Sequence, residues 1–433
     1  MDSIWHSDAP RIKFRAFKGN QSTDVLIIGG GIAGILCAHH LKRAGVDCLL
    51  VEADRICRGI TQNTTAKITL QHGLVYDKTI RRFGEDQARL YAQAQIKACE
   101  KYQPLCEKID CEYETKDSYV YSMNDLKKIG KEVSALNRLG VRAEFSEARE
   151  LPFSVAGAVR VIGQAQFHPL KFLYTLAKDL PICEKTKVIQ FLPHKVQTNH
   201  GSISFQKLIV ATHFPIFNKH GLYPIKLYQH RSYVLALKGV PSMNGMYVDE
   251  SNTGLSFRSL GDLLLLGGGG HRTGKRGGGW QELEEFAQKH YPKAEIVSKW
   301  ATQDCMTLDG IPYIGQYAKS TPDVFVATGF HKWGMSNAMV AAELLCDLVQ
   351  GKPNPYTAVF SPSRTVLRPQ LAVNTFESTV GLLTPTTPRC PHLGCALRYN
   401  RAEHTWDCPC HGSRFTAHGE LIDNPATDDK PIP

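Results

Sequence analysis

The chain lacks a long apolar run: no stretch approaches the roughly 18 consecutive apolar residues that suggest a membrane-spanning helix. Its first residues, Met1–Asp8, also lack the basic flank and apolar core of a secretory signal peptide. The sequence therefore predicts no transmembrane segment and no signal peptide. Both absences favour a cytoplasmic protein.

Basic clusters interleaved with aromatic residues are absent too, although the net charge is +10. Residues 385–433 contain five Lys or Arg and six Asp or Glu, a net charge of −1, so residues 1–384 carry +11. A solvated surface, with some positive potential for anionic ligands, accounts for a charge spread in this way. We therefore predict no nucleic-acid partner.

Closely spaced cysteines are missing from most of the chain. Nine of the thirteen cysteines are scattered singly, which is typical of buried thiols in a reducing compartment. They are Cys37, Cys48, Cys57, Cys99, Cys106, Cys111, Cys183, Cys305 and Cys346. This distribution again favours the cytoplasm.

The other four cysteines gather near the C-terminus together with two histidines. The candidate metal ligands among them are Cys390, His392, Cys408 and His411. Two thiolates and two imidazoles are the ligand set of a Rieske [2Fe–2S] centre, in which two His replace two Cys on one iron. A tetrahedral Cys₂His₂ zinc site is the alternative. Zinc does not require the additional pair Cys395 and Cys410, so the pattern favours the iron–sulfur cluster.

A glycine-rich turn near the N-terminus indicates a dinucleotide site. An apolar run leads into Gly29, Gly31 and Gly34, a helical stretch follows, and a second apolar run stops at Glu52. These glycines permit a tight turn, close approach of a pyrophosphate and close helix packing. Glu52 lies near the usual position of the acid that holds a ribose hydroxyl. Together the segments predict a βαβ nucleotide-binding unit.

Three further segments favour a flavin over a nicotinamide. Residues 59–67 are small and hydroxyl-rich, suited to crossing a pyrophosphate. Residues 324–329 predict a strand that enters a glycine turn, followed by a helix at about 336–349 whose N-terminus would face a flavin carbonyl. Residues 308–315 supply a second tight loop just before that strand.

With these motifs, residues 24 to about 349 resemble the FAD-dependent oxidoreductases of the D-amino-acid oxidase, glycine oxidase and sarcosine oxidase superfamily. The resemblance implies an α/β fold, with a Rossmann-like, doubly wound FAD-binding domain and an inserted mixed-sheet substrate domain. It also implies a set of FAD-binding residues. They are Gly29, Gly31, Gly34, Glu52, Thr64, Thr65, Val188, Thr212, Gly329 and Gly334.

The C-terminal segment separately resembles a small all-β Rieske module. This second resemblance implies a disulfide between Cys395 and Cys410, which link the two ligand loops in Rieske proteins of the respiratory type. It also implies that Ser413 donates a hydroxyl hydrogen bond toward the cluster, whereas Phe415 occupies the position of a hydroxyl-donating Tyr. Flavin oxidoreductases with a fused C-terminal Rieske centre form a bacterial group that this chain resembles.

The predicted domain boundaries follow from these segments. We expect an N-terminal extension at 1–22 and an FAD-dependent oxidoreductase domain at 23–364, with its substrate subdomain at roughly 75–165 and 215–305. A linker at 365–388, with an extended stretch at 382–389, leads into a truncated Rieske module at 389–433. A module this small cannot bury much core, so the cluster, the disulfide and docking on the larger domain must stabilise it.

The middle of the chain should select the substrate. In the family that this chain resembles, a sheet of this region covers the flavin and presents side chains to the substrate. An Arg there would hold a carboxylate, and a His or Tyr would orient or deprotonate an amine. The candidate catalytic residues are Arg231, Tyr233, Arg258, His271, Arg272 and His331.

The resulting hypothesis is an FAD-dependent dehydrogenase that oxidises an amine or amino-acid-like small molecule. Electrons would pass from FAD through the Rieske cluster to an external acceptor, a protein or a quinone. Two alternatives stay open at this point. One is an oxidase that returns electrons to oxygen and holds the cluster as a structural element, and the other is a non-catalytic redox sensor.

Overall fold

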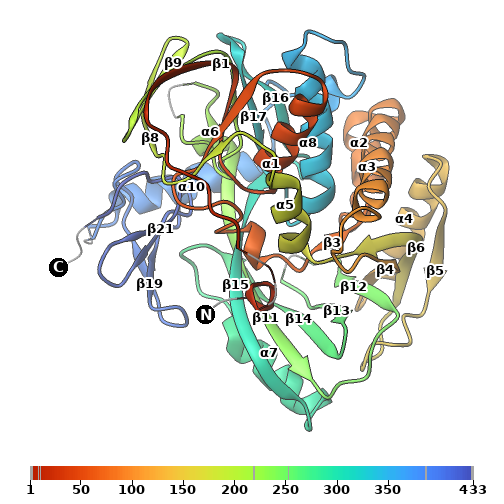
Figure 1. Cartoon of the computed structure of the whole chain (residues 1–433). Coiled ribbons are helices and arrows are strands. Elements are labelled where there is room, and N and C mark those ends of the chain that lie inside the picture. Colours follow the sequence, from red (N-terminus) through yellow and green to blue (C-terminus); the bar gives the residue numbers. More distant parts are fainter. Residues whose placement is uncertain are drawn as a thin grey trace.

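The computed structural model describes residues 3–7, 9, 11–217, 220–251, 253–385 and 388–430. Three sheets organise this part of the chain (Figure 1), with eight, nine and four strands. The two larger sheets and their helices form an α/β body, and the smallest sheet forms an all-β unit near the C-terminus. The predicted fold class is therefore confirmed.

The eight-stranded sheet is doubly wound around β1 (Gly19–Ile28). This strand pairs in parallel with β2 (Cys48–Val51) and β10 (Gly201–Val210), and β10 pairs in parallel with β17 (Thr321–Thr328). The last four residues of β1 are all buried, because a hydrophobic core lies on each face: Val25 and Ile27 belong to the core that contains Ile35 and Leu36, and Leu26 and Ile28 to a second core that contains Val196 and Phe205. The other strands of this sheet are β7 (Ile182–Cys183), β8 (Val188–Leu192), β9 (Lys195–Thr198) and β16 (Tyr313–Ala318).

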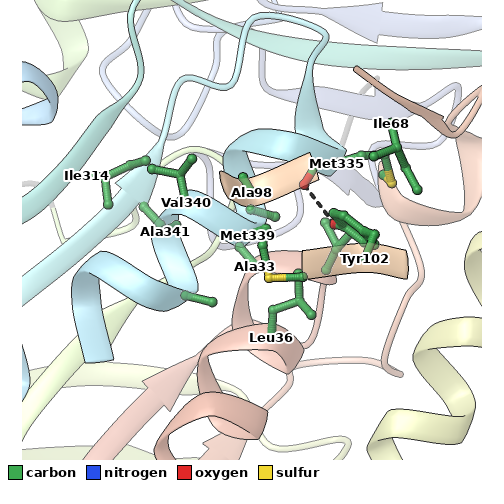
Figure 2. Close-up of a cluster of buried hydrophobic side chains, with 14 of the residues drawn as sticks. Ala33, Leu36, Ile68, Ala98, Tyr102, Ile314, Met335, Met339, Val340 and Ala341 are labelled. Atoms are coloured by element: carbon green, nitrogen blue, oxygen red, sulfur yellow. Dashed lines mark hydrogen bonds between the residues drawn. The ribbon is translucent and has the colours of Figure 1, made fainter. Parts of the chain in front are cut away.

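Three helices pack together beside this sheet: α1 (Ile32–Arg43), α3 (Glu85–Cys106) and α8 (Gly334–Val349). Figure 2 shows their contact, where small and flexible apolar side chains of the three helices meet. The hydroxyl of Tyr102 in α3 donates to the carbonyl of Met335 in α8 at 2.8 Å. One continuous hydrophobic core therefore holds α1, α3 and α8 together.

The nine-stranded sheet is the inserted mixed sheet that the sequence predicts. At one edge, β11 (Leu227–Lys238) pairs antiparallel with both β14 (Leu263–Arg272) and β15 (Glu295–Thr307). The others are β3 (Lys67–Ile68), β4 (Glu114–Ser122), β5 (Ala143–Ser146), β6 (Gly157–Gln166), β12 (Gly245–Asp249) and β13 (Ser256–Leu260). Strand β14 runs through the glycine run 267–270, where its pairing with β11 has a register shift, because ladder hydrogen bonds need no side chain.

Residues 76–106 form two consecutive helices, α2 (Tyr76–Phe83) and α3. Gly84 separates them with a φ of +83°, a conformation that favours glycine. The remaining helices of the large body are α4 (Leu126–Arg138), α5 (Pro169–Ala177), α6 (Tyr223–Lys226), α7 (Gly279–His290) and α9 (Thr357–Phe360). Among the described residues, no helix has both the length and the apolar character needed to cross a membrane.

The N-terminal segment packs on the body. Trp5, in the short 3₁₀ helix η1 (Ile4–His6), is buried, and its Nε1 donates to the carbonyl of Thr64 at 2.8 Å. A second 3₁₀ helix, η2 (Thr61–Asn63), lies in the same loop as Thr64. Because β1 already begins at Gly19, the extension is shorter than the predicted 1–22.

The C-terminal module contains β18 (Arg398–Asn400), β19 (Thr405–Asp407), β20 (Arg414–Thr416) and β21 (Leu421–Asp423), joined as an antiparallel sheet. Within the predicted linker, 365–388, residues 369–383 form helix α10 (Pro369–Leu383). Pro369 begins this helix, as proline does in a first turn. A Cβ on Gly381 would lie 2.5 Å from the Sγ of Cys410, so the helix packs directly on the ligand loops.

Candidate functional site

A cavity of about 770 Å³ opens where β1, β10 and β17 end. Ligands of open α/β sheets bind at the carboxyl ends of the strands, where the strand order reverses. Nine of the ten predicted FAD-binding residues line this cavity. They are Gly29, Gly31, Glu52, Thr64, Thr65, Val188, Thr212, Gly329 and Gly334.

Gly34 is the exception, because it faces the turn and not the cavity. A Cβ there would lie 1.9 Å from the carbonyl oxygen of Gly29, so only glycine allows α1 to pack on the turn. Its effect on a bound dinucleotide is indirect: it fixes the helix N-terminus that faces the cavity.

Glu52 has the surroundings expected of a ribose-binding acid. Its carboxylate accepts hydrogen bonds from the backbone N–H groups of Gly30 at 2.7 Å and Asp54 at 2.8 Å. Burial raises the pKa of Glu52, and these two donors oppose that effect. Thr61 accepts from the N–H of Ile32, the first residue of α1, at 3.1 Å. The remaining turn amides and the carboxylate fit the pyrophosphate and ribose of FAD.

The other end of the cavity holds histidines that burial keeps neutral. His331 accepts at Nε2 from the N–H of Thr307 at 2.6 Å, and burial lowers its pKa to about 4. His72 stacks on Trp333 with a centroid separation of 5.2 Å and contacts the hydroxyl of Tyr91 through Nδ1 at 2.7 Å. Burial lowers the pKa of His72 to about 3. No sequence motif identifies His72 as a cavity residue, because its position depends on contacts of its loop with α3 and α8.

Sequence reasoning also did not identify Lys67, a half-buried lysine in the cavity. Lys67 lines the cavity and donates to the hydroxyl of Thr65 at 3.2 Å. Burial and the neighbouring charge of Arg258 lower its pKa to about 7. A hydroxyl-rich loop was predicted at 59–67, but nothing in that pattern separated Lys67 from a surface lysine.

Of the six predicted catalytic residues, only Tyr233 and His331 line the cavity. Arg258 is buried and donates to the backbone carbonyls of Thr65 and Ala66, the latter at 3.1 Å. His271 is buried behind the cavity wall, stacked on Tyr233 at 5.7 Å. Neither side chain reaches the space where a substrate would bind.

Arg231 and Arg272 point to the C-terminal module. Arg231 forms an ion pair with Glu403, and Arg272 donates to the carbonyls of Pro409 at 3.3 Å and Cys410 at 3.4 Å. Their predicted role as carboxylate clamps is wrong, because both guanidinium groups are already committed to this interface. A sequence pattern could not reveal this, since the partners lie more than a hundred residues away.

The four predicted metal ligands meet in the C-terminal module. The Cys390 and Cys408 thiols are within hydrogen-bonding distance of each other, and the rings of His392 and His411 lie 5.0 Å apart at 89°. The Cys408 thiol, with the Ser413 hydroxyl and backbone N–H groups, lowers the pKa of Cys390 to about 7. The donor set of two thiols and two imidazoles therefore converges on one space.

Unpaired ring nitrogens test whether this space fits a metal cluster. Among the described residues, both ring nitrogens of His392 and Nδ1 of His411 are buried and lack a hydrogen-bond partner. The other ring nitrogen of His411 bonds to the backbone carbonyl of Pro224. Buried nitrogens of this kind are costly unless they bind something, and iron would satisfy them. The carbonyl of Pro224 would then orient the imidazole ligand from behind.

The disulfide between Cys395 and Cys410 is present, as predicted. The sulfurs of these two residues and of Cys408 lie within 4.8 Å of one another. That trio is not a second metal site, because a disulfide has no thiolate to offer.

The Rieske-like module also forms part of the cavity itself, which the sequence did not indicate. Residues 421–424, 426 and 427 of its last segment line the cavity together with the dinucleotide-binding turn. The metal-binding module and the dinucleotide cavity are therefore adjacent parts of one site. Fold and site define a flavin-dependent oxidoreductase joined to a Rieske module.

Family comparisons agree with that class. Residues 24–348 match the family described as FAD dependent oxidoreductase, and residues 362–432 match the Rieske [2Fe-2S] domain. The chain belongs to the FAD-dependent oxidoreductase family and has a C-terminal Rieske domain, so it binds FAD and a [2Fe–2S] cluster. The Rieske match includes α10, which the predicted boundary at 389 left out.

Individual relatives extend the comparison. The chain is 34% identical to the Rieske 2Fe-2S iron-sulfur protein YhfW of Bacillus subtilis (strain 168), over 98% of this chain and 96% of that protein. It is 24% identical to gamma-glutamylputrescine oxidoreductase of Escherichia coli (strain K12), over 77% of this chain and 85% of the relative.

Solved structures show the same fold. Glycine oxidase from Geobacillus kaustophilus has a TM-score of 0.67 at 19% identity, covering 80% of this chain and 99% of that chain. L-proline dehydrogenase from P. horikoshii also has a TM-score of 0.67 at 19% identity, covering 80% and 98%.

Proposed function

We propose that this protein is a dehydrogenase that oxidises an amine or amino-acid-like substrate and passes the electrons through its Rieske cluster to an external acceptor. One observation carries the proposal: Leu421–Asn424 of the Rieske module line the same cavity as the turn at Gly29–Gly31. A cluster module that forms part of the flavin cavity supports electron transfer between the two centres.

The names of relatives support a nitrogen-bearing substrate. Gamma-glutamylputrescine, glycine and proline, which appear in those names, all contain an amine or imine-forming nitrogen. Removal of two electrons and two protons from such a substrate converts its C–N single bond into an imine. Water then adds to the imine and gives a carbonyl compound and an amine or ammonia. FAD supplies the two-electron oxidation, and the cluster carries single electrons.

The chain's own groups suit a substrate that must lose protons. Burial lowers the pKa of His331 to about 4 and that of His72 to about 3, so both rings are neutral near pH 7 and can orient a substrate by hydrogen bonds without adding charge. The pKa of Lys67 is lowered to about 7, so its amine can accept a proton from the substrate or pair with an anionic group of it. His331 stays our candidate among the predicted catalytic residues, whereas Tyr233 lines the cavity but donates its hydroxyl to Glu403 of the Rieske module.

The electron acceptor would take electrons from the cluster one at a time. Two equivalents of a one-electron carrier protein, or one quinone reduced to quinol in two steps, would balance each substrate oxidised. The scattered thiols support a cytoplasmic location for the reaction.

An anaerobic screen of amines and amino acids tests the function. We expect at least one compound to bleach the flavin absorbance, and an artificial one-electron acceptor to restore it over many turnovers. Rapid reoxidation by oxygen that persists after removal of the cluster would support the oxidase alternative. A flavin that no compound reduces would support the redox sensor.

A further inference from the structure

The contact between the flavin cavity and the cluster loop passes through one buried amide side chain. Gln229 of β11 is 1% exposed. Its Nε2 donates to the backbone carbonyl of the cluster ligand His411 at 2.9 Å and to that of Asn424 at 2.9 Å. Its Oε1 accepts from Nε2 of His213 at 3.1 Å. The amide therefore donates twice to the Rieske module and accepts once from the flavin-binding body.

His213 is the cavity's end of this connection. It lies between Thr212 and Phe214 just after β10 and lines the FAD cavity. Two hydrogen bonds thus lead from the cavity wall to the backbone of a cluster ligand. Burial lowers the pKa of His213, so the ring is neutral and its single N–H is the one that Gln229 accepts.

Neighbouring contacts hold the same two segments together. The side-chain amide of Asn424 donates to the carbonyls of Thr212 at 2.5 Å and Phe214 at 2.8 Å. The ring of Phe214 lies 6.3 Å from the ring of His392 and 6.4 Å from that of His411, measured between centroids. Both histidine ligands therefore face an aromatic residue of the flavin-binding body.

The fit at Gln229 leaves no room for adjustment. Gly412, next to His411, has a φ of +87°, and a Cβ there would lie 2.6 Å from the Cβ of Gln229. The cluster loop therefore packs directly on β11, and the Gln229 amide sets the distance between this loop and the strand. A small shift of this loop would change the separation between the cavity and the cluster.

We infer that Gln229 is a positioning residue for electron transfer, which holds the His411 loop against the cavity wall at His213. The inference rests on the proposed function, which requires electrons to pass from the flavin to the cluster across this contact. For each substrate oxidised, two electrons would cross this contact one at a time and leave to two equivalents of an external one-electron acceptor. The protons would stay on the flavin side, since the route needs only electron movement.

A matched control is present on the neighbouring strand. Gln303 of β15 is also buried, and its Nε2 donates to the carbonyl of Gly412 at 2.9 Å. Its Oε1 accepts from Thr273 at 2.8 Å and not from the cavity wall. Gln303→Leu thus removes a hydrogen bond to the same loop and leaves the connection to His213 in place.

The experiment uses the full chain loaded with FAD and cluster, without oxygen. A light flash with a tertiary amine as electron donor reduces the bound flavin, and the cluster's visible absorbance then reports the arrival of an electron. Gln229→Leu should slow that step severalfold, because the rate of electron transfer falls with the separation of the two centres. Gln303→Leu should slow it much less. Gln229→Glu keeps the side chain's size but turns an oxygen toward the carbonyls of His411 and Asn424, so it should slow the step at least as much as Gln229→Leu.

Iron content, FAD content and the cluster's electron-spin spectrum should be unchanged in all three variants, which separates positioning from loss of the cluster. Equal rates in wild type and Gln229→Leu, or equal slowing by Gln229→Leu and Gln303→Leu, would overturn the inference while leaving the proposed function intact. A wild-type protein whose reduced flavin never reduces the cluster would overturn the proposed function and the inference with it.

Discussion

Arg231 of β11 and Glu403 of the Rieske module form a buried, two-pronged ion pair across the junction of the two modules. Arg231 Nε donates to Oε1 at 3.0 Å, and Nη2 contacts Oε2. Tyr233 donates its hydroxyl to the same carboxylate at 2.9 Å, and Arg414 approaches it at 2.7 Å from within the module. The pair explains how a module with a small core is held in one orientation.

Arg231→Met should weaken the docking of the module. The carboxylate of Glu403 keeps Arg414 and Tyr233 but loses its two-pronged partner, and hydrogen bonds to a charged group are typically worth about 1.5–3 kcal/mol. Urea unfolding followed by the cluster's absorbance should show the loss. Lys238→Met is the control on the same strand: its ion pair with Asp262 is exposed, so the change should cost less than about 1 kcal/mol. Equal stability of Arg231→Met and wild type would show that the pair does not hold the module.

The same carboxylate gives the docking a pH dependence. Burial alone would raise the pKa of Glu403, but the charges of Arg231 and Arg414 outweigh it and lower the pKa from 4.5 to about 2. The ion pair's contribution is therefore fully present above about pH 4.5 and is lost as the pH falls toward about 2.

The difference in unfolding free energy between wild type and Glu403→Gln should be largest above pH 4.5 and should shrink below it. The exposed Glu420→Gln in the same module provides the comparison, with little effect at any pH. A difference that grows as the pH falls would contradict the assignment.

Gly31→Leu should eject FAD. A Cβ at this position already lies 3.2 Å from Oγ1 of Thr61, and a longer side chain would extend into the cavity where the pyrophosphate belongs. The purified variant should lack the flavin's visible absorbance and keep the cluster's electron-spin signal. Gly130→Ala in α4, where a Cβ meets nothing within 4 Å, should retain FAD. Stoichiometric FAD in Gly31→Leu would mean that the turn does not cradle the dinucleotide.

The cluster's potential should respond to hydroxyl donors. Ser413 hydrogen-bonds to the Cys390 thiol, whereas Phe415 is fully buried in the module's small core and offers no hydroxyl. A hydrogen bond to a charged acceptor is worth about 1.5–3 kcal/mol, on the order of 100 mV for one electron. A redox titration should therefore find a lower potential in Ser413→Ala and a higher one in Phe415→Tyr. No response to either change would contradict this account of the sulfur's hydrogen bonds.

The parts of the site that depend on local backbone geometry could be predicted from the sequence. The turn at Gly29 and the ligands around Cys390 and Cys408 belong to short segments whose spacing is set by the turn or the metal. The fold class and both cofactors followed from these segments. The helix at 369–383 was not predicted, because the Thr, Ser and Val residues of this segment favour helix only weakly and its packing against Cys410 stabilises it.

The catalytic residues were harder to predict, since their roles depend on which module each side chain faces. Arg231 and Tyr233 are two residues apart on one strand, so their side chains lie on the same face, and both contact Glu403 of the Rieske module. No local pattern indicates that another module covers this face. Similarly, Gln229 is an ordinary strand residue until the loop that contains His411 is placed beside it.

The central claim, that electrons from the substrate reach the cluster, is tested most directly by electron-spin resonance of the full protein under anaerobic conditions. The sample is mixed with an amine or amino acid that bleaches the flavin and is then frozen. The account predicts the spectrum of a reduced Rieske cluster, with mixed nitrogen and sulfur ligation, approaching one spin for each chain. A fully bleached flavin beside a cluster that stays oxidised and silent would contradict it.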